Sequence, residues 1–389
     1  MKEAVAHELA AAYHSRIVDE IRASDFVRRS GRLTIHLARE FGFCYGVDRA
    51  VDYAYQTRKR FPDARVFLTG EIIHNPHVND RLRALDIRFL TDPDEQPASL
   101  GADDVVILPA FGVSIGELAA LEQSGCTLVD TTCGSVLNVW KNVRRYAQEG
   151  FTSVIHGKMN HEETRATASQ ATQYPGGHFL VVRDEDEAAS ACAFIRQDGD
   201  PAAFVARFGE ALSPGFSPRE HLQRVGCANQ TTMLMSESLR IGQMFREAMA
   251  DRYGQAELKT RFRAFDTICS ATQERQDAVV AMLDTHPVHL TVVIGGYNSS
   301  NTCNLARICA ERAPAFHIAE PDCLVSATEI RHRPIGAPST TAIPETVTRN
   351  WLPAGLVSVG LTAGASTPNN IVGEVISRLE ALTGVAGQG

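Results

Sequence analysis

Short apolar segments recur along the 389-residue chain, and each is followed by a polar loop and then by a helical pattern. Alternation of strands with helices indicates α/β units with mostly parallel sheets. We therefore predict strands at Val66–Leu68, Val105–Leu108, Thr127–Val129, Ser153–Ile155, Phe179–Val182, Leu290–Ile294 and Leu356–Leu361.

Two tetrapeptides are near copies of each other, Asp130-Thr131-Thr132-Cys133 and Asp266-Thr267-Ile268-Cys269. Each follows an apolar or extended stretch and precedes an amphipathic helical pattern. A third elbow of similar design surrounds Cys44, where Val47, Val51 and Ala54 continue the helical spacing. The sequence therefore predicts three cysteines that each lie where a strand ends and a helix begins.

A helix N-terminus favours a thiolate over a thiol. Three thiolates presented in equivalent ways suggest one shared metal centre. They suit an iron–sulfur cluster with one iron left open to substrate, whereas structural zinc normally takes four protein ligands. The remaining cysteines are expected to be inert packing residues, because free cysteine is among the most buried residue types; they are Cys126, Cys192, Cys227, Cys303, Cys309 and Cys323.

The composition, with 44% hydrophobic and 22% charged residues, is that of an ordinary globular protein long enough for two or three domains. The net charge of -8 argues against a nucleic acid or an anionic membrane as partner. We find no secretory signal and no apolar run of the roughly 18 residues that span a bilayer. The nine cysteines include no C-x-x-C pair, so we expect reduced thiols and a cytoplasmic location.

The repeated elbow suggests related domains. We expect a helical N-terminal extension over 1–32 and α/β domains over 33–132, 133–268 and 269–389. Two proline-rich stretches, at about 198–220 and 331–353, have the composition of insertions or linkers.

Polar motifs follow the predicted strands, at the carboxyl ends where parallel sheets bind ligands. Asn298-Ser299-Ser300-Asn301 and Ser366-Thr367-Pro368 each open a helix, so they either cap it or cradle a phosphate. His74 and His161 are candidates for phosphate binding or proton transfer, or make structural hydrogen bonds. Of Glu162 and Glu163 at most one can face a site. Thr231 or Thr232 could pass a proton between that acid and a substrate. These residues indicate a metal-centred redox or elimination enzyme for a phosphorylated small molecule.

With these motifs assembled, residues 33–382 resemble the 4-hydroxy-3-methylbut-2-enyl diphosphate reductase family of the non-mevalonate isoprenoid pathway. The resemblance rests on motifs in the order of the family: Gly42-Phe43-Cys44 with Gly46–Ala50, Ile73-His74-Asn75, Asp130–Cys133, Asp266–Thr272 with Arg275-Gln276, Asn298–Asn301 and Thr362–Ser366.

The resemblance implies a trefoil of three α/β domains around one [4Fe-4S] cluster, with Cys44, Cys133 and Cys269 as ligands. It implies that the substrate diphosphate is held by His74, His161, Ser299, Ser300, Asn301 and Ser366. Glu163 and Thr231 match the proton-relay acid and the threonine beside it. The expected partners are the allylic diphosphate and an electron donor such as ferredoxin or flavodoxin.

The chain departs from the common pattern at Phe111, where many members carry a diphosphate-binding histidine, and we assign no such role to Phe111. The sequence His161-Glu162-Glu163 also differs from the common His-Pro-Glu. Both departures resemble the plant and cyanobacterial branch. The alternatives are a dehydratase resembling quinolinate synthase, which needs no net electrons, an iron–sulfur sensor or scaffold, and a cysteine hydrolase using Cys44 or Cys133 with His74.

Overall fold

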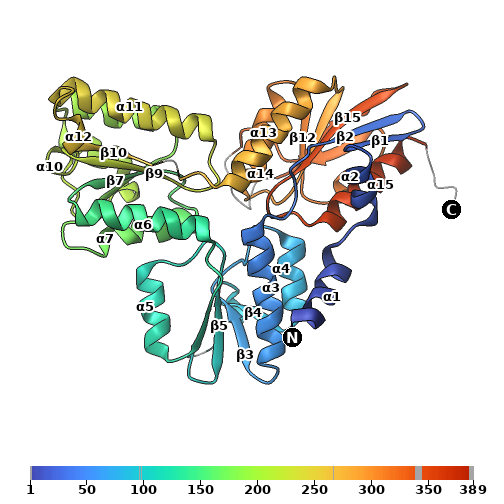
Figure 1. The fold of residues 1–389 in the computed structure, drawn as a ribbon, viewed down its shortest axis with the longest axis horizontal. Helices are drawn as coiled ribbons and strands as arrows, with labels where there is room; N and C mark the ends of the chain where they lie inside the picture. The colour runs from blue at the N-terminus through green and yellow to red at the C-terminus, as the bar shows by residue number, and fades with distance from the viewer. Residues whose placement is uncertain (1, 96, 98, 266, 338–343, 385–389) are drawn as a thin grey trace. The chain divides into compact units, whose positions relative to one another are not determined.

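The computed structural model describes residues 2–95, 97, 99–265, 267–337 and 344–384. The chain forms two compact units. The first unit comprises Met1–Pro62, Glu71–Ile87 and Ser270–Gly389, and the second comprises Asp63–Gly70 and Arg88–Cys269. The two ends of the chain, blue and red in Figure 1, therefore fold together, and the middle of the chain forms the second unit.

The first unit is built on a five-stranded sheet in the order β1-β2-β15-β11-β12. Neighbouring strands pair in parallel, except that β1 is antiparallel to β2. A separate antiparallel pair is formed by β13 and β14. The strands are β1 (Val27–Ser30), β2 (Leu33–Leu37), β11 (Leu290–Ile294), β12 (Ala315–Ile318), β13 (Glu329–His332), β14 (Thr346–Arg349) and β15 (Val357–Ala363).

The helices of this unit are α1 (Lys2–Tyr13), α2 (Arg16–Ala23), α3 (Tyr45–Arg60), α4 (Pro76–Ala84), α13 (Ser270–Thr285), α14 (Ser300–Ala310) and α15 (Asn369–Leu382), with a 3₁₀ turn at Pro321–Cys323. Helices α2 and α15 pack on one face of the sheet, and α13 and α14 pack on the other.

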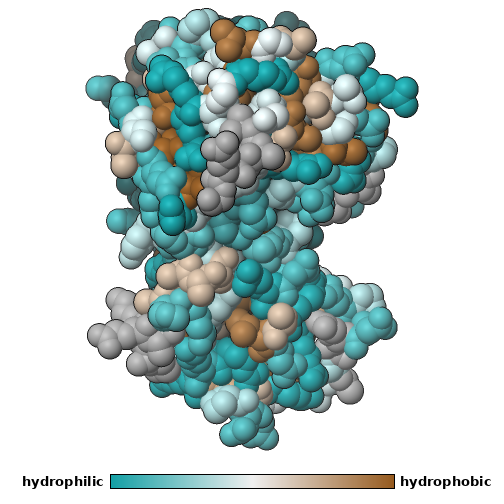
Figure 2. Space-filling model, turned by 90° about the vertical axis from the view of Figure 1, so that its right-hand side faces the viewer, coloured by the Kyte–Doolittle hydropathy of each residue, from teal (hydrophilic) through white to brown (hydrophobic). Residues whose placement is uncertain are grey.

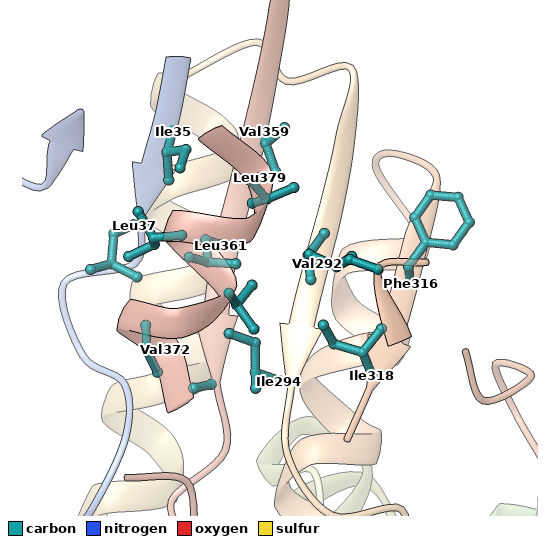
Figure 3. Packing of buried hydrophobic residues seen from close by; sticks show 14 of the residues in the cluster. Ile35, Leu37, Val292, Ile294, Phe316, Ile318, Val359, Leu361, Val372 and Leu379 are labelled. Atoms are coloured by element: carbon teal, nitrogen blue, oxygen red, sulfur yellow. The ribbon is translucent and has the colours of Figure 1, made fainter. Parts of the chain in front are cut away.

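Alternate residues of β11 face opposite sides of the sheet. Val292 and Ile294 pack with Leu379 of α15 in the main core (Figure 3), whereas Val293 packs with α13 and α14. Burial on both faces explains why this parallel strand is a continuous apolar run in the sequence.

The second unit contains two four-stranded sheets, in the orders β4-β3-β5-β6 and β10-β9-β7-β8. The pairs of β5 with β3 and β6, and of β7 with β8 and β9, are parallel, as is the pair of β9 and β10. The strands are β3 (Arg65–Leu68), β4 (Ile87–Phe89), β5 (Asp104–Leu108), β6 (Thr127–Asp130), β7 (Thr152–His156), β8 (Phe179–Val182), β9 (Val225–Asn229) and β10 (Phe262–Ala264).

In the sheet around β7, Val154 packs with α8 and α11 on one face, and Ile155 packs with α6 and α7 on the other (Figure 1). The helices of this unit are α5 (Ile115–Ser124), α6 (Gly134–Gln148), α7 (Glu162–Thr172), α8 (Glu185–Gln197), α9 (Pro201–Phe208), α10 (Pro218–His221), α11 (Met235–Tyr253) and α12 (Leu258–Arg261), with 3₁₀ turns at Pro93–Glu95 and Gly209–Ala211.

The predicted α/β class with mostly parallel sheets is confirmed, and each predicted strand is present within one or two residues of its expected bounds. The domain boundaries after residues 32, 132 and 268 stay predictions. The first 32 residues contain the β1 strand in addition to α1 and α2.

The proline-rich stretch at 198–220 is not an unstructured linker. Pro201 and Pro218 lie in the first turns of α9 and α10, where a missing N–H costs nothing. Phe204, Phe208 and Phe216 are buried in the core around β7 and β9. The stretch at 331–353 includes the end of β13 and all of β14. Its residue Pro338 lies outside the described residues.

The large hydrophobic side chains that are exposed are spread over several elements, as in Tyr45 of α3, Leu239 of α11 and Leu356 before β15. On the face shown in Figure 2, hydrophilic residues separate the hydrophobic ones into small areas. Among the described helices, none is both long enough and apolar enough to cross a membrane.

Gly373 of α15 allows α2 to approach closely, and this contact can be tested. An added Cβ at Gly373 would lie 2.1 Å from Oγ of Ser15, which caps α2 by accepting the N–H of Val18. If the Ser15 side chain turned away, α2 would lose a cap worth about 0.5–2 kcal/mol. We expect Gly373→Ala to lower the free energy of unfolding by about 1 kcal/mol in urea denaturation, because overpacking adds to the lost cap.

The control is Gly242→Ala in α11, where an added Cβ meets nothing within 4 Å. Alanine there should raise the free energy of unfolding by about 0.5–1 kcal/mol, as it does in an open helix. An equal gain from both substitutions would contradict the close contact at Ser15.

Candidate active site

Each of the three elbow cysteines lies directly before a helix. Cys44 and Cys133 are the N-cap residues of α3 and α6 and have extended backbones, and Cys269 immediately precedes α13. All three side chains are partly buried. The predicted placement of these cysteines at strand-to-helix elbows is confirmed, although Asp266 of the third elbow lies outside the described residues.

The three elbows share one hydrogen-bond pattern. In each, the cysteine N–H donates to the second residue beyond the end of the neighbouring parallel strand, which is β15, β5 or β9. The bonds join Cys44 to the carbonyl of Ala365 at 3.3 Å, Cys133 to that of Ala110 at 3.0 Å and Cys269 to that of Thr231 at 3.2 Å.

The threonine shared by the two tetrapeptides has a structural role. Oγ1 of Thr131 donates to the carbonyl of Leu108, the last residue of β5, at 2.6 Å. Oγ1 of Thr267 accepts the N–H of Asn229, the last residue of β9, at 2.8 Å. Both threonines are buried. The hydroxyl therefore ties each elbow to the end of the adjacent strand, which explains why the motif occurs twice.

Four other cysteines are fully buried, and burial raises the pKa of each thiol. The pKa rises to about 12 for Cys192 and Cys309. Thiols held protonated in this way are poor metal ligands. The three elbow cysteines are partly exposed and lie at helix N-termini, and cysteine is the usual protein ligand of a soft metal centre such as an iron–sulfur cluster.

A cluster of polar side chains in the first unit surrounds the N-terminus of α14. Ser299 caps the helix by accepting the N–H of Thr302 at 3.3 Å. Oδ1 of Asn301 accepts the N–H of Ala365 at 3.0 Å, while its buried Nδ2 has no hydrogen-bond partner among the described residues. Ser299, Ser300 and Asn301 are all buried. An unsatisfied buried donor at a helix N-terminus is suited to an anion.

Close backbone approaches hold this cluster together. Oγ of Ser366 donates to the carbonyl of His74 at 3.1 Å. An added Cβ at Gly296 would lie 2.4 Å from that same carbonyl, and one at Gly364 would lie 2.0 Å from Oγ1 of Thr302. Only glycine allows the loop after β11 to pack so closely against the segment that carries His74, and the loop after β15 to pack so closely against α14.

His74 is oriented by a carboxylate that sequence reasoning did not single out. Its Nδ1 lies 2.8 Å from Oε2 of Glu71, and Nδ2 of Asn298 donates to the same oxygen at 2.9 Å. Burial acts to raise the pKa of Glu71, but its interactions with His74 and Asn298 prevail and lower that pKa below its usual value. An ionised Glu71 accepts a hydrogen bond from Nδ1–H of His74, and this bond orients the ring.

In the second unit, Glu163 and Thr231 form a buried pair. Thr231 donates its N–H to Oε1 of Glu163 at 2.6 Å and its hydroxyl to Oε2 at 3.0 Å. Glu163 is 1% exposed, whereas the neighbouring Glu162 is on the surface. Thr231 also accepts the N–H of Cys269, so this pair is connected directly to a cysteine elbow.

His161 is the N-cap of α7, and its Nδ1 accepts the N–H of Glu163 at 3.2 Å. Because Nδ1 is an acceptor, the ring hydrogen of a neutral His161 is on Nε2. The ring of Phe111 packs edge-on against His161, with 5.6 Å between the ring centroids. Phe111 therefore supports the orientation of His161. Many members of the family that the sequence resembles have a histidine at the position of Phe111.

Each unit thus brings together a part of the predicted site. In the first unit, Ala365 accepts the N–H of Cys44 and donates its own N–H to Asn301, which links this cysteine to the polar cluster. In the second unit, Thr231 links Cys269 to Glu163. Sequence reasoning missed Gln230, whose side chain joins Thr164 and Thr232 next to this pair.

Comparison with known proteins identifies the family. The family model described as LytB protein matches residues 35–380, so the chain belongs to this family. It is 50% identical to the 4-hydroxy-3-methylbut-2-enyl diphosphate reductase of Gloeobacter violaceus, over 100% of this chain and 92% of that protein. It is 46% identical to the reductase of the same name from Thermosynechococcus vestitus, over 99% of this chain and 93% of that protein.

Solved structures support the fold. A structure of (E)-4-hydroxy-3-methyl-but-2-enyl diphosphate reductase matches with a TM-score of 0.53 at 26% identity, covering 89% of this chain and 99% of the other. The Plasmodium falciparum E-1-hydroxy-2-methyl-but-2-enyl-4-diphosphate reductase matches with a TM-score of 0.62 at 20% identity, covering 88% and 86%. The second likeness bears on the fold alone.

The role of Glu71 leads to a prediction. Glu71→Gln removes the anionic partner of His74 but keeps the size of the side chain, so the ring is oriented less firmly and an anion bound by His74 should bind more weakly. Hydrogen bonds to charged groups contribute about 1.5–3 kcal/mol, so we expect the KM for an anionic substrate to rise on the order of tenfold, with kcat little changed.

The effect should depend on pH in a defined direction. Because the folded-state pKa of Glu71 is lowered, its interaction with His74 is present at neutral pH and is lost only as the pH falls through that lowered value. Steady-state kinetics should therefore show the largest difference from the wild type near neutral pH, and a smaller one in acid. An unchanged KM at neutral pH would contradict an orienting role for Glu71.

Proposed function

We propose that this chain catalyses the reductive dehydroxylation of (E)-4-hydroxy-3-methylbut-2-enyl diphosphate to isopentenyl diphosphate and dimethylallyl diphosphate, the last step of the non-mevalonate pathway. Two curated relatives with the reductase name cover nearly the whole chain, which supports this assignment. The structural observation that carries it is the threefold repetition of one cysteine elbow at Cys44, Cys133 and Cys269.

The cofactor is one [4Fe-4S] cluster ligated by these three cysteines, in a family of iron–sulfur enzymes. The donor set supports this assignment, because three thiolates leave one iron without a protein ligand. When bound, such a cluster supplies electrons one at a time and an open coordination position at iron. The two electrons come from a small carrier protein such as ferredoxin or flavodoxin.

The diphosphate of the substrate is bound mainly by neutral donors. The proposed residues are His74, His161, Ser299, Ser300, Asn301 and Ser366. The unpartnered Nδ2 of Asn301 supports this role, as does the position of Ser299 and Ser300 at the N-terminus of α14. A fixed set of buried dipoles binds the anion without the rotamer entropy that long lysine or arginine side chains lose.

Glu163 supplies one of the protons that the reaction consumes. Removal of the hydroxyl as water and formation of the product together require two electrons and two protons. The Thr231 hydroxyl donates to Oε2 of an ionised Glu163 at 3.0 Å. When Glu163 is protonated, Oε2–H donates to Oγ1 instead, so the threonine can accept this proton while it donates its own hydrogen onward. The burial of both side chains supports this path, because bulk water does not compete for the proton.

The reaction is tested by following the oxidation of reduced methyl viologen by anaerobically purified, iron-replete protein. We expect oxidation only when 4-hydroxy-3-methylbut-2-enyl diphosphate is added, with two electrons consumed per substrate. Absence of oxidation by an iron-replete sample would refute the proposal, and turnover without a reductant would indicate a dehydratase. Cys133→Ser should lose iron and activity, whereas Cys126→Ser, outside the elbows, should retain both.

The proton-transfer role is tested by a matched pair of adjacent residues. Glu163→Gln keeps the size of the side chain and its ability to form hydrogen bonds, but it cannot release a proton. We therefore expect kcat to fall by roughly 100-fold or more, with iron content and KM close to those of the wild type. Glu162→Gln changes the exposed neighbour and should leave kcat nearly unchanged. Similar kcat values for the two variants in the viologen assay would exclude Glu163 as the proton donor.

A further inference from the structure

Arg275 is a buried cation next to the Cys44 elbow. It lies in α13 and is 3% exposed. Its Nη2 donates to the carbonyls of Gly42 at 2.7 Å and Phe43 at 3.1 Å, and its Nε donates to Gly42 at 3.2 Å. Its Nη1 donates to the carbonyl of Ala271 at 2.8 Å, in the first turn of α13. One guanidinium therefore joins the backbone before Cys44 to the helix that follows Cys269 in the chain.

These bonds fix the peptide group that precedes Cys44. The carbonyl side of the Phe43–Cys44 peptide accepts from Arg275, and the N–H side donates to Ala365. A peptide plane held from both edges cannot rotate freely. The backbone on the N-terminal side of Cys44 is therefore fixed, and this restricts where Sγ of Cys44 can point.

The other two elbows achieve the same restraint differently. There a threonine two residues before the cysteine bonds to the neighbouring strand through its hydroxyl, as Thr131 and Thr267 do. The corresponding residue before Cys44 is Gly42, which has a φ of 73° and no hydroxyl. An added Cβ at Gly42 would lie 3.0 Å from Oδ1 of Asn369, so a threonine does not fit there without a shift. Arg275 supplies the missing restraint.

Arg275 also brings a charge that is not neutralised locally. Arginine stays protonated in proteins, and over the described residues no carboxylate lies within ion-pair distance of Arg275. The charge of Arg275 acts on Asp48, whose pKa is raised by burial and lowered in part by Arg275. A fixed positive charge favours the more negative, reduced state of a metal centre.

We propose that Arg275 is a positioning residue for the metal centre, which holds the Cys44 ligand in its direction and raises the reduction potential of the cluster. This inference rests on the proposed iron–sulfur function. It predicts two separable effects. One depends on the fork, which is the planar set of N–H donors that lysine lacks, and the other depends on the positive charge, which lysine keeps.

Two variants separate them. Arg275→Lys keeps the charge and loses the fork, so iron release to a chelator should be at least fivefold faster while the reduction potential stays near that of the wild type. Arg275→Met loses both, so iron release should also be faster and the potential should become more negative. The potential is measured by redox titration followed by electron paramagnetic resonance. The control is Arg312→Met, an exposed arginine that pairs with Asp284, which should change neither quantity.

The outcomes decide the inference in each case. Iron release from Arg275→Lys at the wild-type rate would overturn the positioning role, and an unchanged potential in Arg275→Met would overturn the role of the charge. If Arg275→Met does not fold, as judged by circular dichroism, Arg275→Gln takes its place. If neither folds, the chelator rate of Arg275→Lys alone decides. Wild-type protein that binds no iron would instead overturn the proposed function itself.

Discussion

The candidate site depends on the parallel pairing of neighbouring strands, because this pairing places their carboxyl ends at one edge of a sheet. At such an edge the cysteine that follows one strand lies within hydrogen-bond distance of the loop that follows the neighbouring strand in the sheet. Cys44, Cys133 and Cys269 all donate their N–H groups to such loops. A change of strand register would move the elbow as well as the strand, so the position of each cysteine backbone depends on the pairing of the strands.

Hydrogen bonds then extend from the elbows to the other polar side chains. Ala365 connects Cys44 with Asn301, and Thr231 connects Cys269 with Glu163. A buried polar group that lacks a partner costs about 1–3 kcal/mol, so nearly every member of these networks is satisfied by another. The exception is Nδ2 of Asn301, where the fold bears this cost at the position proposed for a ligand.

Much of this arrangement could be predicted because its signals are local. Strands such as β11 are continuous apolar runs, and helices after the cysteines have apolar residues at helical spacing. Strands β2 and β9 escaped prediction because His36 and Gly226 interrupt their apolar patterns, although both strands are buried. Helix α9 escaped because Pro201 resembles a breaker when its position in the first turn is unknown.

In the site, the cysteines and the capping residues could be predicted, since a cysteine or a serine before a helix is a short pattern. The orienting groups could not. Arg275 bonds to carbonyls 232 and 233 residues away in the sequence. The pairing of Gln230 with Thr164 spans 66 residues. Glu71 is only three residues from His74, but this spacing alone does not show that the two side chains meet. Asn298, which lies in a distant loop, bonds to the same carboxylate oxygen.

The pairing of β2 with β15 sets an order for the biosynthesis of the protein. Cys44 is synthesised more than 300 residues before its hydrogen-bond acceptor, Ala365, and before the strand beside its elbow, which ends at Ala363. The middle of the chain, which forms the second unit, emerges while the first unit is still incomplete. The Cys44 elbow therefore closes only after Ala365 has left the ribosome, and a metal cluster bound as proposed by the three cysteines would be inserted only after that point.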